Sequence, residues 1–272
     1  MSAVVIAELL DWITEMILAD EKHYLLAVSL ERDRISSFEQ YPYSLPVCRH
    51  LDTLKLHPAV TFFIGENGTG KSTLLEAMAV AAGFNAEGGS RNMRFSTRES
   101  HSPLHDVLSL RRSLKRPRDG YFLRAESFFN VASEIEHLDA EAEKYAGLSA
   151  PPIINSYGSR SLHEQSHGES FLKLVMERFG GHGLYILDEP EAALSPTRQL
   201  SLLVRIHELV KQGSQFIVAT HSPIIMAYPE ATIYQLSEED IKCVKYTETE
   251  HYTVTRDFLN RHESTLKDLL TE

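Results

Sequence analysis

The sequence predicts an α/β fold with a mainly parallel central sheet, flanking helices and an additional antiparallel β part. Three short apolar segments, residues 59–64, 183–188 and 215–219, have the length and composition of buried strands. Helix-forming segments follow the first two, at residues 72–82 and 196–212. Strands that alternate with helices along a chain favour a parallel sheet. The apolar face of the second helix is expected to contain Leu200, Leu203, Val204 and Val210.

A glycine-rich loop connects the first strand to its helix. It reads Gly65-Glu-Asn-Gly-Thr-Gly70-Lys71-Ser72-Thr73 and matches G-x-x-x-x-G-K-[ST] at every fixed position. In such a loop, backbone N–H groups converge on phosphate oxygens and the helix N-terminus adds positive potential. Lys71 is expected at the β- and γ-phosphates of a nucleoside triphosphate, and Ser72 at Mg²⁺. The predicted contacts are Asn67, Gly68, Thr69, Gly70, Lys71, Ser72 and Thr73.

Polar side chains end the other two strands. Asp188 and Glu189 end the second strand and His221 follows the third. The carboxyl ends of parallel strands meet at one edge of the sheet, where ligands bind. Asp188 is therefore predicted to ligate Mg²⁺ and Glu189 to orient or deprotonate the attacking water. His221 is predicted to contact the γ-phosphate.

Composition limits the class of protein. The 272 residues are 43% hydrophobic and 24% charged, which suits one large domain with an insertion. Cys48 and Cys243 are far apart, so a reducing compartment is expected and no zinc site. The N-terminus lacks the features of a signal peptide and no segment is apolar enough to span a membrane, so a cytoplasmic protein is expected. A net charge of −11 argues against nucleic-acid binding over the whole surface, but not against a local basic patch.

The ends of the chain are predicted to be helical. Residues 1–22 form an amphipathic helix that packs on the domain or docks a partner. Residues 25–31 and 47–56 are expected to be strands, and an aromatic between them, Tyr41 or Tyr43, either packs locally or stacks on an adenine ring. Two further strands are expected at residues 232–236 and 242–246, before a polar helical tail at 251–272 that carries no identified catalytic residue.

A basic insertion is predicted at residues 84–120, with a polar, loop-like character. Only Glu99 and Asp106 oppose its eight cations between residues 91 and 118. These cations either pair with the acidic body of the protein or bind an anionic partner, such as nucleic acid or the nucleotide phosphates. The eight are Arg91, Arg94, Arg98, Arg111, Arg112, Lys115, Arg116 and Arg118.

A second anion-binding loop is a weaker candidate. Ser166 and Gly168 precede a helix that begins near Ser170 and has its apolar residues on one face. Backbone N–H groups at that N-terminus could meet an anion, although serine and glycine before a helix are also ordinary capping residues.

Taken in order, these segments resemble the ABC-type ATPase family over most of residues 45–236. The phosphate-binding loop comes first, then Ser166-His167-Gly168-Glu169 in the place of the signature, then Asp188-Glu189, then Glu191-Ala-Ala-Leu-Ser-Pro in the D-loop place, and last His221 as the switch histidine. Glu-Pro-Glu-Ala-Ala-Leu-Ser-Pro and Ala-Thr-His-Ser-Pro resemble the bacterial "predicted ATPase" branch, akin to SMC-like and recombination-repair ATPases rather than to transporter subunits.

Two departures from the family pattern stand out. The signature has His167 where transporters usually have glycine. No glutamine follows the strand at residues 121–125, where the family normally has one that touches Mg²⁺ and the lytic water, and Glu126 is the nearest candidate.

The resemblance implies an ABC-type ATPase domain at residues 23–250 that binds ATP and Mg²⁺ as a head-to-tail homodimer. Lys71, Ser72, Asp188, Glu189 and His221 would come from one subunit, and Ser166 and Gly168 from the other. The leading hypothesis is an ATP-driven dimerisation switch that acts on nucleic acid or on a protein partner. The alternatives are the nucleotide-binding subunit of a transporter and a nucleotide-sensing scaffold.

Overall fold

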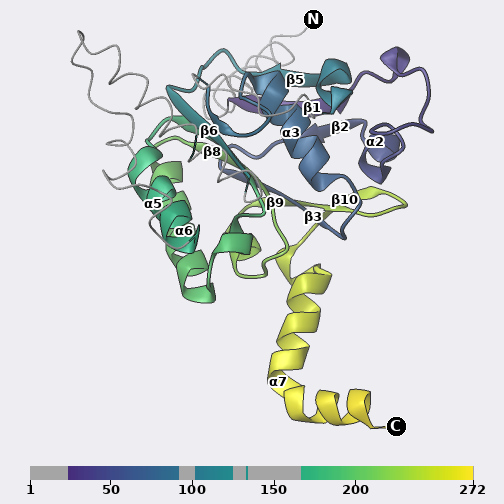
Figure 1. Ribbon diagram of the computed structural model, residues 1–272, viewed down its shortest axis with the longest axis vertical. Helices are drawn as coiled ribbons and strands as arrows, with labels where there is room; N and C mark the ends of the chain where they lie inside the picture. The colour runs from purple at the N-terminus through teal and green to yellow at the C-terminus, as the bar shows by residue number, and fades with distance from the viewer. Residues whose placement is uncertain (1–23, 92–101, 125–132, 134–166, 272) are drawn as a thin grey trace, which may run out of the picture.

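A computed structural model describes residues 24–91, 102–124, 133 and 167–271 of the chain (Figure 1). Several expectations lie outside these residues. They are the amphipathic helix at 1–22, the part of the basic insertion at 92–101, Glu126 and Ser166.

The central sheet has seven strands in the order β10-β9-β3-β8-β7-β6-β4. Its five inner strands pair in parallel, and the two edge strands are antiparallel to their neighbours. The mainly parallel α/β fold predicted from the sequence is therefore confirmed. The strands are β3 (Val60–Gly65), β4 (Gly89–Ser90), β6 (Asp119–Arg124), β7 (Gly183–Asp188), β8 (Gln215–Ala219), β9 (Thr232–Leu236) and β10 (Ile241–Val244).

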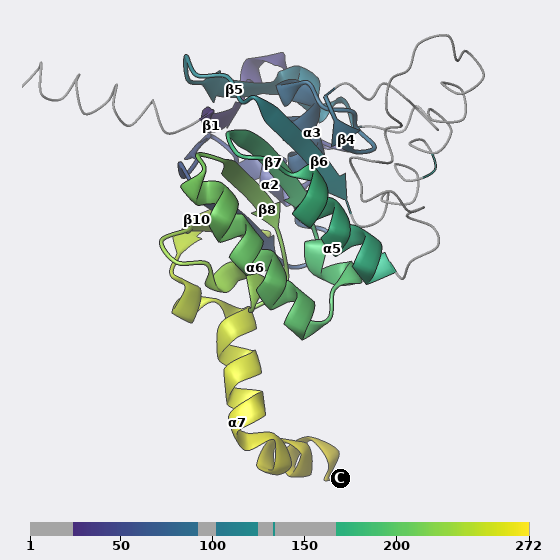
Figure 2. The same ribbon diagram turned by 90° about the vertical axis from the view of Figure 1, so that its left-hand side faces the viewer.

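Helices cover both faces of this sheet (Figures 1 and 2). On one face, α3 (Lys71–Ala82) buries Leu74, Leu75 and Met78 against side chains such as Ile186 and Ile217. On the other face, α5 (His167–Arg178) and α6 (Pro196–Lys211) pack on the opposite side chains of the same strands. Strands β3, β7 and β8 are buried along their whole length, as expected for a parallel sheet covered on both sides.

The apolar face predicted for α6 is wrong for Leu200 and Val204. The helix buries Leu202, Ile206 and Leu209, whereas Leu200 and Val204 are 55% and 61% exposed. Two apolar stripes run along this helix at helical spacing, and spacing alone does not tell which of them faces the sheet.

A smaller antiparallel sheet has the strand order β2-β1-β5, formed by β2 (Thr53–Lys55), β1 (Leu25–Leu30) and β5 (Leu108–Arg112). The single strand predicted at residues 47–56 is wrong for its first part, which forms α2 (Pro46–His50). Proline is favoured at the first position of a helix, and a short apolar run does not by itself distinguish a helix from a strand.

The described part of the basic insertion is not a polar loop. Strand β5 pairs with β1, and the short helix before it buries Leu104 and Val107 against the core under α3. The apolar residues of this segment are too few and too irregularly spaced to predict a helix or a strand. Their burial in the core could therefore not be predicted from the sequence.

A long C-terminal helix, α7 (Glu250–Leu270), extends away from the body and changes direction at Arg261 (Figures 1 and 2). The tail is therefore helical, as predicted. Short 3-10 helices complete the described elements: η1 (Arg32–Arg34), η2 (Pro103–Val107), η5 (Pro190–Ala193), η6 (Ile225–Ala227) and η7 (Tyr246–Glu248). Among the described residues, no helix has the length and hydropathy needed to cross a membrane.

Candidate functional site

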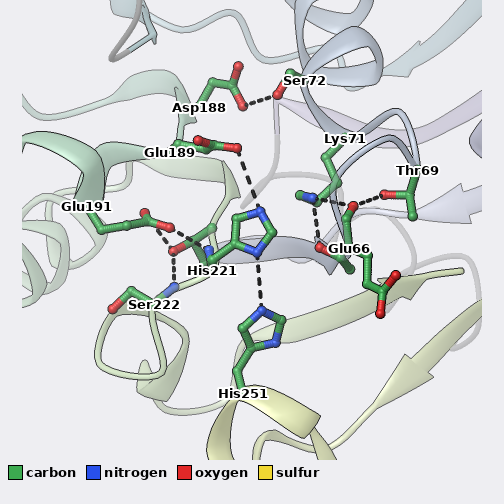
Figure 3. Close-up of polar contacts among 12 residues, drawn as sticks. Glu66, Thr69, Lys71, Ser72, Asp188, Glu189, Glu191, His221, Ser222 and His251 are labelled. Atoms are coloured by element: carbon green, nitrogen blue, oxygen red, sulfur yellow. Dashed lines mark hydrogen bonds and ion pairs between the residues drawn. The ribbon is translucent and has the colours of Figure 1, made fainter. Parts of the chain in front are cut away.

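The carboxyl ends of β3, β8 and β7 lie side by side and bring the predicted site residues together (Figure 3). The loop after β3 supplies Lys71 and Ser72, the end of β7 supplies Asp188 and Glu189, and the segment after β8 supplies His221. This is the edge of a parallel sheet at which ligands bind.

The glycine-rich loop depends on glycine at two closely packed positions. Gly65 and Gly70 have φ values of 141° and 96°, which other residues rarely adopt. A Cβ atom on Gly65 would lie 2.2 Å from the carbonyl oxygen of Leu236, and one on Gly70 would lie 2.5 Å from a methyl carbon of Val47. The loop is thus held between β9 and α2, and it leads directly into the N-terminus of α3.

The Lys71 ammonium group lies inside the loop. The side chain is 4% exposed, and its Nζ donates to the carbonyl oxygens of Gly65 at 2.7 Å and Glu66 at 2.9 Å. Burial lowers the pKa of Lys71, while the carboxylates of Glu189 and Asp188 oppose this shift. A buried cation with only carbonyl partners favours an anionic ligand.

Ser72 and Asp188 form the donor set expected for Mg²⁺. The Ser72 hydroxyl donates to Asp188 Oδ1 at 3.0 Å, and this carboxylate is buried. Its Oδ2 lies 3.6 Å from Nε of Arg124, whose Nη1 pairs with Glu76 at 2.6 Å. Oxygen ligands from one hydroxyl and one carboxylate fit Mg²⁺, which takes its other ligands from phosphates and water. No group of three or more His, Cys, Asp or Glu side chains in the described part of the chain forms a metal cage.

Glu189 has a strained backbone. Its φ and ψ are 50° and 52°, in the left-handed region, and its N–H donates to the carbonyl of Ala219 on β8. Such a conformation costs on the order of 1–3 kcal/mol and is concentrated at functional sites. It directs the carboxylate toward Nε2 of His221, at 3.7 Å (Figure 3).

The backbone around His221 is fixed by Glu191, which the sequence analysis placed in the D-loop but gave no role. Glu191 accepts hydrogen bonds from the His221 N–H and from the Thr220 hydroxyl, the latter at 2.8 Å. Burial raises the pKa of Glu191, and these hydrogen bonds oppose the shift. The segment after β8 is therefore tied to the segment after β7.

The His221 ring presents a nitrogen that lacks a hydrogen-bond partner. Its Nε2 is buried, and no hydrogen-bonding group of the described residues reaches it. Burial and the charge of Lys71 lower the pKa of His221. A buried ring nitrogen without a hydrogen-bond partner fits a phosphate oxygen as its acceptor.

Two cavities flank the loop. One has a volume of about 700 Å³ and is lined by Glu66, Asn67, Glu189, His221, Glu250, His251, Val254 and Thr255. The other, of about 630 Å³, lies along Gly65–Thr69 and reaches Pro46, Arg49 and Glu238. Neither Tyr41 nor Tyr43 lines these cavities, so the structure gives no support to either as an adenine-stacking residue. Arg49, Glu250 and His251 line these cavities although no motif of the sequence predicts them there.

Gly168 packs against the segment that follows β7. It is buried at the start of α5, where an added Cβ would lie 2.3 Å from the carbonyl oxygen of Ala193. The neighbouring Glu169 pairs with Arg198 at 3.1 Å. Gly168 lines neither of the two cavities.

Comparison with known proteins gives two matching family models. An AAA domain family described as putative AbiEii toxin, Type IV TA system, matches residues 158–227, and a second AAA domain family matches residues 34–144. The ABC transporter G family member STR2 of Medicago truncatula is 28% identical over 60% of this chain and 24% of that protein. The macrolide export ATP-binding/permease protein MacB of Hahella chejuensis is 26% identical over 72% of this chain and 31% of that protein. The chain thus spans less than a third of the length of these two relatives.

Similar solved structures include ATPase domains of two kinds. The SMC head domain from Thermotoga maritima has a TM-score of 0.43 and 16% identity, over 82% of this chain and 99% of that one. A nucleotide-free ATP-binding cassette from an ABC transporter has a TM-score of 0.48 and 16% identity, over 86% and 95%.

Segments of the chain are thus similar to two AAA domain families, and the phosphate-binding loop and the strand order agree with a P-loop fold.

Proposed function

We propose that this protein binds ATP with Mg²⁺, hydrolyses ATP to ADP and phosphate, and uses ATP to join two copies head to tail as a switch. The observation that carries the proposal is the convergence of Lys71, Asp188, Glu189 and His221 at one sheet edge beside a cavity of about 700 Å³. A cation, a metal-binding pair, a carboxylate and a histidine together suit phosphoryl transfer to water.

Each side chain then has one task. Lys71 and the N–H groups at the start of α3 hold the phosphates, and Ser72 and Asp188 would hold Mg²⁺. The metal, when bound, neutralises charge on the phosphate oxygens. Glu189 orients the attacking water and accepts its proton, and His221 donates from Nε2 to the γ-phosphate.

The second copy supplies what one protomer lacks. Gly168 does not line the two cavities beside the phosphate-binding loop of its own chain. Ser166 and Gly168 of a second copy would place another helix N-terminus at the γ-phosphate. The cysteines, one buried and one exposed without a disulfide, suit the cytoplasmic location that we propose.

Phosphate release from ATP tests the proposed activity. We expect steady release by the full chain in Mg²⁺, and release at background level when EDTA is in excess, because the Ser72–Asp188 pair provides oxygen ligands but no cation of its own for the phosphates. Equal rates with and without EDTA would contradict the metal site, and no release under either condition would contradict the activity.

The basic segment favours an anionic partner such as nucleic acid. Arg111, Arg112, Arg116 and Arg118 are exposed, and none of them pairs with an acidic side chain of the described residues. Arg112 and Arg116 lower the pKa of Arg91, after the effect of burial, so these cations lie close together. Exposed arginines that pair with no acidic side chain of the described residues support binding to phosphates.

Neutralising this segment tests the nucleic-acid partner. Changing Arg111, Arg112, Lys115 and Arg116 to Gln is expected to weaken binding to single- or double-stranded DNA or RNA by about 10-fold or more and to lower its salt dependence. Fluorescence anisotropy at several salt concentrations measures both. Changing Arg256 and Lys267 on α7 to Gln is the control. Unchanged binding, or binding that the control substitutions weaken equally, would contradict the nucleic-acid site. The segment would then be an ordinary solvent-exposed surface.

A second candidate function is the nucleotide-binding subunit of a membrane transporter, which the matches to STR2 and MacB favour. Copurification of this chain with a membrane protein would favour the transporter subunit over the proposed switch. A nucleotide-sensing scaffold, the third alternative, would bind ATP and dimerise with little turnover.

A further inference from the structure

His251 of the C-terminal helix contacts the switch histidine. Its Nε2 lies 3.2 Å from Nδ1 of His221, and the two rings are tilted by 51° (Figure 3). Both rings are partly buried and both line the cavity next to the phosphate-binding loop. The mechanism above uses the Nε2 side of His221 and leaves this second contact without a role.

The start of α7 is fastened to the segment that carries His221. The Tyr246 hydroxyl donates to the carbonyl of Pro223 at 2.8 Å. Thr249 is buried, donates to the carbonyl of Tyr246 at 2.8 Å and accepts from the N–H of Tyr252. His251 therefore stands in the first turn of a capped helix, at a defined place beside His221.

The groups around His221 favour the neutral tautomer with hydrogen on Nε2. Its Nε2 faces the Glu189 carboxylate at 3.7 Å, and a lone pair there would repel that oxygen. The neutral ring with hydrogen on Nε2 leaves a lone pair on Nδ1, which needs a donor. The Nε2–H of His251 is positioned to be that donor. Burial lowers the pKa of both histidines, which agrees with two neutral rings.

We propose that His251 is a positioning residue: it donates a hydrogen bond to Nδ1 of His221 and thereby keeps hydrogen on Nε2, aimed at the terminal phosphate of the nucleotide. The part of this inference that concerns the phosphate rests on the proposed function. The tautomer itself is a property of the protein without nucleotide.

Two substitutions of similar size separate positioning from packing. His251→Gln keeps an N–H at the place of Nε2, and His251→Leu fills the space without a donor. We expect His251→Leu to lower kcat by about 10-fold, the lower end of the loss when a histidine in a metal site loses its orienting partner. KM for ATP should change less than 2-fold, and His251→Gln should retain most of the rate. His262→Leu, at an exposed position of the same helix, is the control.

Nitrogen chemical shifts of ¹⁵N-labelled histidine test the tautomer directly in the nucleotide-free full chain. The chain has 13 histidines, so the His221 signals are assigned by their loss in His221→Gln. We expect hydrogen on Nε2 in the wild type and in His251→Gln, and a mixture of tautomers in His251→Leu.

The two measurements fail independently of each other. A wild type that does not hydrolyse ATP contradicts the proposed function, and the spectra still decide the tautomer. Hydrogen on Nδ1 of His221 in the wild type, or equal kcat for His251→Leu and His251→Gln, would overturn the role of His251.

Discussion

Replacing Glu189 by Gln is expected to lower kcat for ATP hydrolysis by about 100-fold or more, the range typical of the loss of a general base. Glutamine has nearly the same shape but cannot accept the proton of the attacking water. ATP affinity should be retained. Among the described residues, the Glu189 side chain makes no hydrogen bond to the phosphate-binding loop or to Asp188. Phosphate release and equilibrium binding of ATP measure the two quantities.

The control for this variant is Glu177→Gln, on an exposed position of α5 away from the site. It should leave both quantities unchanged. A Glu189→Gln protein that turns over ATP at the wild-type rate would exclude Glu189 as the base, and the same rate loss in Glu177→Gln would show that the assay reports a general defect.

Replacing Lys71 by Ala is expected to weaken ATP binding by about 100-fold. Hydrogen bonds to charged groups contribute about 1.5–3 kcal/mol each, and we propose that the Lys71 ammonium contacts two phosphates of ATP. In the present structure its Nζ donates to the carbonyls of Gly65 and Glu66. These hydrogen bonds lie within the loop, so the group can turn to the nucleotide without leaving it.

Isothermal titration calorimetry with ATP measures this loss, and thermal denaturation shows whether the variant is folded. Lys55→Ala, at an exposed position of β2, is the control and should bind ATP normally. Unchanged ATP affinity in a folded Lys71→Ala protein would mean that the loop does not hold phosphates.

The central strands and the site residues at their carboxyl ends could be predicted from the sequence, because each is marked by a short, continuous stretch of sequence. Each of β3, β7 and β8 is a mostly apolar run that ends in, or is followed by, glycine or polar residues, and parallel strands align such ends. The sequence alone therefore predicts that Asp188, Glu189 and His221 lie near Lys71. Their chemical roles are still predictions.

The remaining features depend on contacts between distant segments. His251 lies on a polar helix whose sequence gives no sign that its first turn reaches His221. The hydrogen bonds that Glu191 accepts from Thr220 and His221 connect the segments after β7 and β8, which α6 separates in the sequence. The start of α2 was mistaken for a strand because Val47 and Cys48 are apolar in either conformation.

The central claim, that ATP joins two copies of this chain, is tested most directly by light scattering on the Glu189→Gln protein with saturating ATP and Mg²⁺. The account predicts twice the monomer mass with ATP and the monomer mass with ADP, because both nucleotides bind but only ATP offers a γ-phosphate to a second subunit. A protein that stays monomeric at saturating ATP would contradict the dimer, and with it the roles of Ser166 and Gly168.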